Sequence, residues 1–112
     1  MKLQEIEAEV VGFSRERDWD QFHNPKDLAL AVSIEAAELL EIFQWKNDAL
    51  SQQEVNHAVS EIADVAQYLI LLCRKLDTDL ETVIMSKLAA NKARFPVEES
   101  RGKAKSKSMG AD

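Results

Sequence analysis

The sequence predicts an all-α protein of four helices that associates with further copies of itself. Three Gly and two Pro among 112 residues leave few positions for turns, which favours few and long elements. Helix-start signals recur along the chain. One long segment, from Ile62 to Cys73, is apolar on all sides of a helix, as expected where a second subunit covers it.

The first helix is expected from about Leu3 to Arg17, where apolar residues recur at helical spacing. The loop "DWDQFHN" follows it. Its aromatic residues Trp19 and Phe22, together with His23, are unusual in a connecting segment.

The second helix is expected to begin at "NPKD" and to run to about Trp45. Asn24 can cap it, Pro25 fits the first helical position, and Asp27 suits the positive end of the helix dipole.

The third helix is expected to begin at "SQQE", where Ser51 and Glu54 form a capping box, and to continue to about Leu76. The fourth is expected to begin at "TDLE", a further capping box, and to stop before Pro96. We therefore expect one domain over residues 1–96 and a disordered tail over residues 97–112, which is rich in charge and poor in apolar side chains.

Charge and cysteine content exclude several classes of function. The net charge is −6, and the body is more acidic than the tail, so it should repel nucleic-acid polymers and should bind phosphate groups only through a cation. The single Cys73 lies in an apolar run, where a core role is expected, and forms no disulfide framework. The N-terminus is not a signal peptide, and no segment is long enough to span a membrane, so we expect a cytoplasmic protein.

Carboxylates interrupt the apolar face of the second helix. Glu35 and Glu38 fall on the inward stripe when successive residues are turned by about 100°. The third helix repeats the pattern with Glu61 and Asp64, which are three residues apart and hence neighbours on one face. The full stripe on the second helix is Leu28, Ala31, Glu35, Glu38, Ile42 and Trp45.

Four such carboxylates need a cation, because unpaired buried carboxylates are destabilising and raise one another's pKa. The lysines and arginines of these two helices lie near the helix ends, so they are poorly placed to serve. An all-oxygen ligand set suits Mg²⁺, with Mn²⁺ as a substitute, better than zinc. Glu35, Glu38, Glu61 and Asp64 are thus the predicted metal ligands.

Glu54 and His57 form an E-x-x-H pattern typical of di-iron bundles. Such bundles need two copies of the pattern, and the sequence holds one. His57 is therefore interpreted as a surface histidine or as a partner of a metal ligand.

The paired acidic motifs, the aromatic loop and the ending "SKLAANKARFP" resemble the MazG-like superfamily of all-α nucleoside triphosphate pyrophosphohydrolases. The stretches "ERDWDQFHNPKDLALAVSIEAAELLEIFQW" and "SEIADVAQYLILL" are most similar to its dCTP pyrophosphatase branch. The resemblance covers roughly residues 10 to 96. It implies a four-helix-bundle-like protomer that forms a dimer or a dimer of dimers.

The resemblance also implies a reaction and a set of residues. A (deoxy)nucleoside triphosphate, here dCTP or a modified dCTP, is hydrolysed to the monophosphate and pyrophosphate with Mg²⁺. Glu35, Glu38, Glu61 and Asp64 hold the metal, and Glu38 is our choice for the residue that orients or deprotonates water. Residues that match positions around the base and sugar are Trp19, His23, Trp45 and Tyr68, and those that match positions near phosphates are Lys87, Asn91 and Arg94.

Each of these residues also has a simpler interpretation. The two tryptophans and Tyr68 could be ordinary core residues, His23 could support the start of the second helix, and Lys87 and Arg94 could form a solvated helix face. If the simpler interpretations hold, the chain is a helical interaction module that oligomerises and catalyses nothing.

Overall fold

The computed structural model describes residues 1–104, which form two compact units. The first unit is Met1–Glu81 and the second begins at Thr82. Every regular element in the described part of the chain is a helix, which confirms the predicted all-α class. The fourth helix passes into the second unit, so its place in a four-helix bundle stays a prediction.

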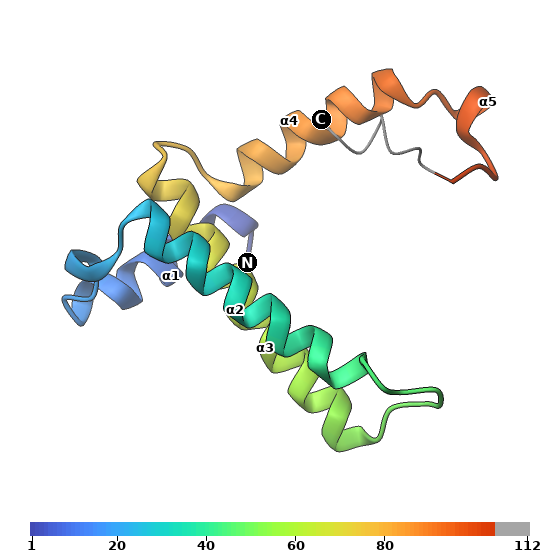
Figure 1. Ribbon diagram of the computed structural model, residues 1–112. Coiled ribbons are helices and arrows are strands. Elements are labelled where there is room, and N and C mark those ends of the chain that lie inside the picture. Colours follow the sequence, from blue (N-terminus) through green and yellow to red (C-terminus); the bar gives the residue numbers. More distant parts are fainter. Residues whose placement is uncertain (105–112) are drawn as a thin grey trace. The chain divides into compact units, whose positions relative to one another are not determined.

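The first unit is built on a pair of long helices. α2 and α3 pack side by side along their length, and α1 packs against α3 (Figure 1). The buried core consists of Val11 from α1, Leu28 from α2, and Ile70 and Leu71 from α3. The elements of this unit are α1 (Leu3–Glu16), the short 3-10 helix η1 (Asp20–Phe22), α2 (Pro25–Phe43) and α3 (Gln52–Lys75).

The predicted starts of α2 and α3 are confirmed by their caps. The Asn24 side chain accepts a hydrogen bond from the backbone N–H of Asp27 at 2.9 Å, and Pro25 opens α2. Ser51 Oγ accepts from the N–H of Glu54 at 3.1 Å, while the Glu54 carboxylate accepts from the N–H of Ser51 at 2.8 Å. The second helix was expected to reach about Trp45, but α2 ends at Phe43, so Trp45 lies in the turn beyond it.

Two aspartates end helices in a way that sequence reasoning missed. Asp18 and Asp77 have φ of 57° and 59°, the left-handed conformation in which glycine usually ends a helix. The next residue then donates back into the last turn, from Trp19 N to Ser14 O and from Thr78 N to Cys73 O, both at 3.0 Å. The first of these turns fixes the backbone of Trp19 at the end of α1.

The start of α4 (Leu80–Arg94) is held by a distant side chain. The Glu7 carboxylate on α1 is fully buried and accepts hydrogen bonds from the backbone N–H groups of Leu80 at 2.6 Å and Glu81 at 3.3 Å. These N–H groups have no partner inside the helix. An acidic group at this position also matches the positive end of the helix dipole.

The second unit contains the remainder of α4 and the short helix α5 (Val97–Ser100). The disordered tail expected from residue 97 stays a prediction, although Val97–Ser100 form a helix here with Glu98 and Glu99 in its first turn. Residues 105–112 lie outside the described residues. None of the helices among residues 1–104 combines the length and the apolar sequence that crossing a bilayer requires.

Large apolar side chains remain exposed on the α2–α3 pair. On α2, Ile34 is 57% exposed and Leu40 is 60% exposed, and on α3 Val59 and Ile62 are more than half exposed. The apolar segment of α3 is thus only partly covered within the first unit.

Candidate metal centre and nucleotide pocket

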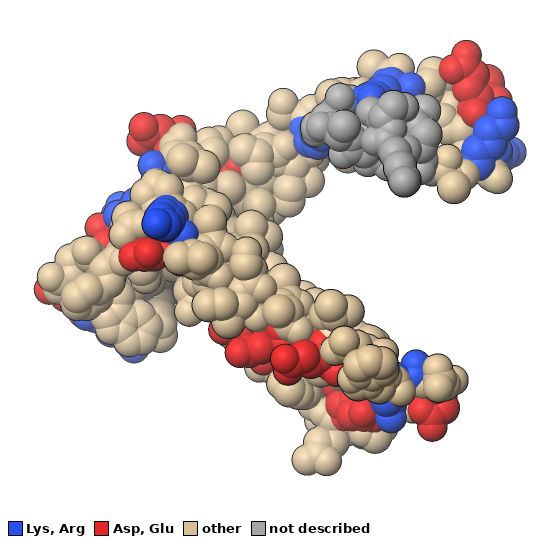
Figure 2. Space-filling view, viewed as in Figure 1, with Lys and Arg blue, Asp and Glu red and all other residues tan. Residues whose placement is uncertain are grey.

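Three of the four predicted acidic residues meet between α2 and α3. One carboxylate oxygen from each of Glu35, Glu38 and Glu61 lies within 4.8 Å of the others. Glu61 is buried, at 7% exposure, and Glu35 is half-buried. Acidic side chains also gather on the visible surface of the α2–α3 pair (Figure 2). We call these three residues the acidic cluster.

The carboxylates of the acidic cluster raise the pKa of two of its members, Glu35 and Glu38. A hydrogen bond with Glu61, reinforced by burial, raises the pKa of Glu35 above its ordinary value. A hydrogen bond with Glu35 and the charge of that residue raise the pKa of Glu38. A carboxyl group shifted in this direction favours its neutral form unless a cation is supplied.

Glu61 is the buried member of the acidic cluster and has one described ion-pair partner outside that cluster. Its Oε1 lies 3.3 Å from Nε2 of His57, one turn earlier on α3. Its Oε2 is buried and has no hydrogen-bond partner among the described residues. The lysine ion pairs described in the first unit lie elsewhere, from Lys46 to Glu54 and Asp48 and from Lys75 to Asp20. A buried carboxylate oxygen without a donor fits a divalent cation.

Asp64, the fourth predicted ligand, is not among the three clustered carboxylates. Its charge does contribute to the raised pKa of Glu35. It lines a cavity of about 330 Å³ together with Trp19, His23 and Tyr68, which were predicted to surround the base and sugar. Its role as a metal ligand stays a prediction. The remaining lining residues are Val10, Phe13, Ser14, Gln67 and Leu71.

This cavity, the aromatic pocket, is closed on one side by the loop that carries Trp19 and His23. The Trp19 ring packs edge-on against Phe13, with ring centroids 5.6 Å apart. An ion pair of 3.0 Å from Lys75 to Asp20 ties the loop to the end of α3, and hydrogen bonding to Lys75 lowers the pKa of Asp20. Nδ1 of His23 is buried without a described partner, so it is available to a ligand.

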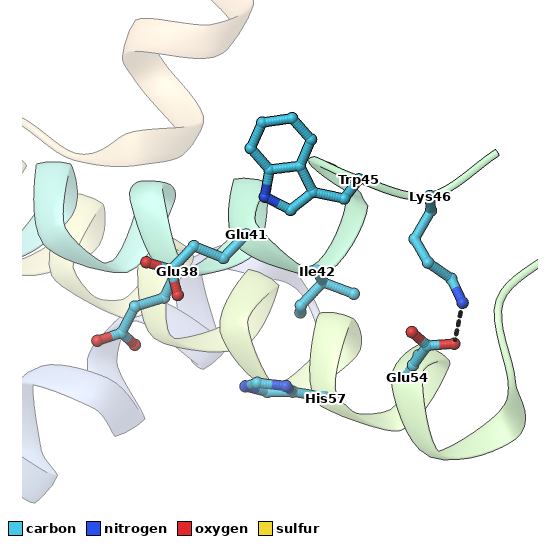
Figure 3. A pocket seen from close by; sticks show the side chains of 7 residues that line it. All are labelled: Glu38, Glu41, Ile42, Trp45, Lys46, Glu54 and His57. Atoms are coloured by element: carbon cyan, nitrogen blue, oxygen red, sulfur yellow. Dashed lines mark ion pairs between the residues drawn. The ribbon is translucent and has the colours of Figure 1, made fainter.

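Trp45 lies apart from the aromatic pocket in this chain. It is 84% exposed and lines a different cavity of about 500 Å³, with Glu38 and Ile42 of α2 and Glu54 and His57 of α3 (Figure 3). We call this the Trp45 cavity. Trp45 and Glu38 line this cavity together, as the helical wheel grouped them, although α2 ends two residues before Trp45. A role for Trp45 beside the base or sugar stays a prediction.

Lys46 and Glu54 close one end of the Trp45 cavity with an ion pair of 3.1 Å (Figure 3). The hydrogen bond from the Ser51 backbone and the charge-assisted bond from Lys46 lower the pKa of Glu54. Glu54 is therefore a structural carboxylate, in contrast to the members of the acidic cluster.

Lys87, Asn91 and Arg94 lie on α4 in the second unit, at spacings of four and three residues that place them on one face of the helix. A role near phosphate groups stays a prediction for them.

Sequence reasoning missed some residues of the site. It left open whether His57 supports a metal ligand, although its spacing of four residues from Glu61 was a usable signal. It did not identify Phe13 and Gln67 as pocket-lining residues, because no spacing rule links α1 to this part of α3.

Comparison with known proteins decides the family. The model of the MazG-like family matches residues 30–108, which include the acidic cluster, Asp64 and the polar face of α4. The chain belongs to the MazG-like family.

Relatives of this MazG-like chain include nucleotide-hydrolysing proteins. It is 40% identical over 108 residues to dCTP pyrophosphatase 1 of Rattus norvegicus, which covers 91% of this chain and 64% of that protein. It is 37% identical over 105 residues to dCTP pyrophosphatase 1 of Homo sapiens, covering 88% and 62%. The chain thus spans less than two thirds of the length of these relatives.

The fold is also similar to a solved structure. A pyrophosphatase from Archaeoglobus fulgidus is 34% identical, with a TM-score of 0.67 over 84% of this chain and 92% of that one. The similarity over most of both chains supports the all-α architecture predicted from the sequence.

Proposed function

We propose that the chain hydrolyses a deoxynucleoside triphosphate, namely dCTP or a modified dCTP, to the monophosphate and pyrophosphate with Mg²⁺. The observation that carries the proposal is the acidic cluster, in which three carboxylates converge and a buried oxygen of Glu61 lacks a donor among the described residues. The names of the relatives support the substrate class.

In the proposed reaction the phosphoanhydride bond between the α- and β-phosphoryl groups breaks. Water adds its hydroxyl to one side of this bond and its second hydrogen to the other, so the products are dCMP and pyrophosphate. Mg²⁺ held by the acidic cluster supplies positive charge against the triphosphate and makes water more acidic. Glu38 is assigned as the residue that orients or deprotonates water, a role for a carboxylate of the cluster that the metal does not saturate.

The aromatic pocket is proposed to hold the base and sugar. Trp19 and Tyr68 offer flat apolar faces for stacking, and His23 offers a buried nitrogen for a hydrogen bond. Asp64 lines this pocket and also acts electrostatically on Glu35, so the pocket and the acidic cluster adjoin. A nucleotide would thus have its base in the pocket and its phosphates toward the metal ligands, including Asp64.

We also propose that the active form is a homodimer or a dimer of dimers. The exposed side chains of Ile34 and Leu40 on α2 and of Val59 and Ile62 on α3 support this assembly, because a second subunit would remove their apolar surface from water. Light scattering at several protein concentrations would measure the assembly directly.

Product identification tests the proposed reaction. The protein is incubated with Mg²⁺ and each common ribo- and deoxynucleoside triphosphate in turn, and nucleotides and phosphates are separated by chromatography. The expected products from dCTP are dCMP and pyrophosphate in equal amounts, with slower hydrolysis of the other substrates. Release of orthophosphate would contradict the assigned bond. Absence of any hydrolysis would favour a non-catalytic helical module.

A further inference from the structure

His57 is the one side chain outside the acidic cluster that is described in contact with its buried member. Its Nε2 lies 3.3 Å from Oε1 of Glu61. The two residues are one helical turn apart on α3, a spacing at which side chains meet without any distortion of the backbone. The His57 side chain is 60% exposed and that of Glu61 is 10% exposed, so the contact runs from the surface inward.

The two carboxylate oxygens of Glu61 have different surroundings. Oε1 lies 3.3 Å from Nε2 of the imidazole, within reach of an N–H donor, and Oε2 is buried without a donor among the described residues. In orientations between the two equivalent ones that a half-turn interconverts, neither carboxylate oxygen would reach His57. The imidazole therefore restrains rotation of the carboxylate and keeps one oxygen available to a cation.

The kind of donor also matters. An imidazole can offer a single N–H donor at Nε2, whereas a lysine ammonium at this position would bring a full positive charge that competes with a metal ion. His57 on α3 and Ile42 on α2 both line the Trp45 cavity (Figure 3), and the His57 side chain is 60% exposed. The imidazole ring thus contacts Glu61 while remaining exposed to solvent.

We propose that His57 is a positioning residue, which orients the Glu61 carboxylate for a divalent cation through the Nε2–Oε1 hydrogen bond. The inference rests on the proposed metal-dependent function. Hydrogen-bond partners of metal ligands commonly change metal affinity by about 10- to 100-fold when they are removed. Glu61 itself remains the ligand, and His57 touches neither the cation nor the nucleotide.

The test measures Mn²⁺ binding by titration calorimetry, without nucleotide, on the full chain. His57→Leu removes the donor, and His57→Gln restores an N–H donor at a similar reach. Gln53→Leu, an exposed substitution one turn earlier on α3, is the matched control. Circular dichroism confirms that each variant is folded.

We expect His57→Leu to weaken Mn²⁺ binding by about 10- to 100-fold. His57→Gln should recover most of this loss, and Gln53→Leu should bind as the wild type does. A parallel assay with dCTP should show that His57→Leu needs more Mg²⁺ to reach half its maximal rate, with a near-normal rate at saturation. If His57 only helped the protein to fold, His57→Gln would not restore Mn²⁺ affinity. The Mg²⁺ requirement would then also not change separately from the maximal rate.

Two results would overturn the inference: His57→Leu binds Mn²⁺ as tightly as the wild type, or His57→Gln binds no better than His57→Leu. Failure of the proposed function looks different, because the wild type would then bind Mn²⁺ and still leave dCTP intact. A wild-type chain that binds no Mn²⁺ would overturn both.

Discussion

Two buried glutamates of the first unit show how differently one residue type can be used. Glu7 is fully buried on α1, and its carboxylate is satisfied by two backbone N–H groups at the start of α4. Glu61 is buried between α2 and α3 beside two further carboxylates, and its Oε2 has no described donor. Backbone donors satisfy the first carboxylate, whereas the second has a buried oxygen that we propose is satisfied by a cation.

This contrast separates stability from function. Removing the Glu7 carboxylate leaves backbone N–H groups without a partner, so it should lower stability. Removing charge from the acidic cluster relieves repulsion in the metal-free protein, so it should lower activity without lowering stability.

The largest expected effect is on catalysis in Glu61→Gln. The amide keeps the size of the side chain and an oxygen that can accept from His57, but it loses the negative charge. We expect kcat/KM for dCTP to fall by about 10³-fold, which corresponds to roughly 4 kcal/mol of transition-state stabilisation. Steady-state assays of pyrophosphate release at saturating Mg²⁺ measure this change.

The control for that variant is Glu5→Gln, which removes one charge from an exposed position in the first turn of α1. It should retain wild-type kinetics. If Glu61→Gln also retained them, or if it unfolded, the distinction between the two buried glutamates would fail.

A smaller effect, on stability, is expected for Glu7→Leu. The apolar side chain leaves the N–H groups of Leu80 and Glu81 without the acceptor they have in the wild type. The free energy of unfolding should fall by about 1–3 kcal/mol, and Glu7→Gln, which keeps an acceptor oxygen, should lose less. Urea denaturation at a fixed protein concentration gives both values. An unchanged midpoint for Glu7→Leu would show that this carboxylate does not hold α4.

The smallest expected effect is a change in how stability varies with pH. The pKa of Glu35 is raised above 4.5 in the folded protein, so the folded state binds its proton more tightly than the unfolded state does. The contribution of this group to stability is present below pH 4.5 and is lost as pH rises through the raised pKa. Without metal, the decrease in Tm from pH 4.5 toward neutrality should be smaller in Glu35→Gln than in the wild type.

Glu54 provides the opposite case for this measurement. Its pKa is lowered, so its contribution is present above pH 4.5 and is lost only as pH falls below that value. The two groups therefore act in different pH ranges. Adding Mg²⁺ at neutral pH should raise the Tm of the wild type more than that of Glu35→Gln. Identical pH profiles for the two proteins would contradict the described repulsion.

Local sequence signals predicted the helices and the convergence of the acidic residues. The caps at Asn24 and Ser51 act within three residues, so their geometry follows from the sequence alone. Glu35 and Glu38 lie on a regular stretch of α2, and their inward stripe meets Glu61 as the wheel indicated. These features depend on helical periodicity and on one pair of adjacent helices.

Features that depend on chain ends and distant contacts could not be predicted in this way. The partner of Glu7 is 73 residues away in sequence, and no local pattern indicates such a contact. The end of α2 at Phe43, before Trp45, was not marked by any local stop signal. The left-handed Asp18, which fixes Trp19, was also missed because that conformation is usually recognised from glycine.

The most direct test of cation binding by the acidic cluster is a crystal structure of the full chain grown with Mn²⁺, in which anomalous scattering locates the ion. We predict an anomalous peak within coordination distance of Glu35, Glu38 and Glu61. Oε2 of Glu61 should be a ligand of the ion, and Oε1 should remain in contact with Nε2 of His57. Mn²⁺ bound elsewhere in the protein, with a protein cation seated among the three carboxylates, would contradict this prediction.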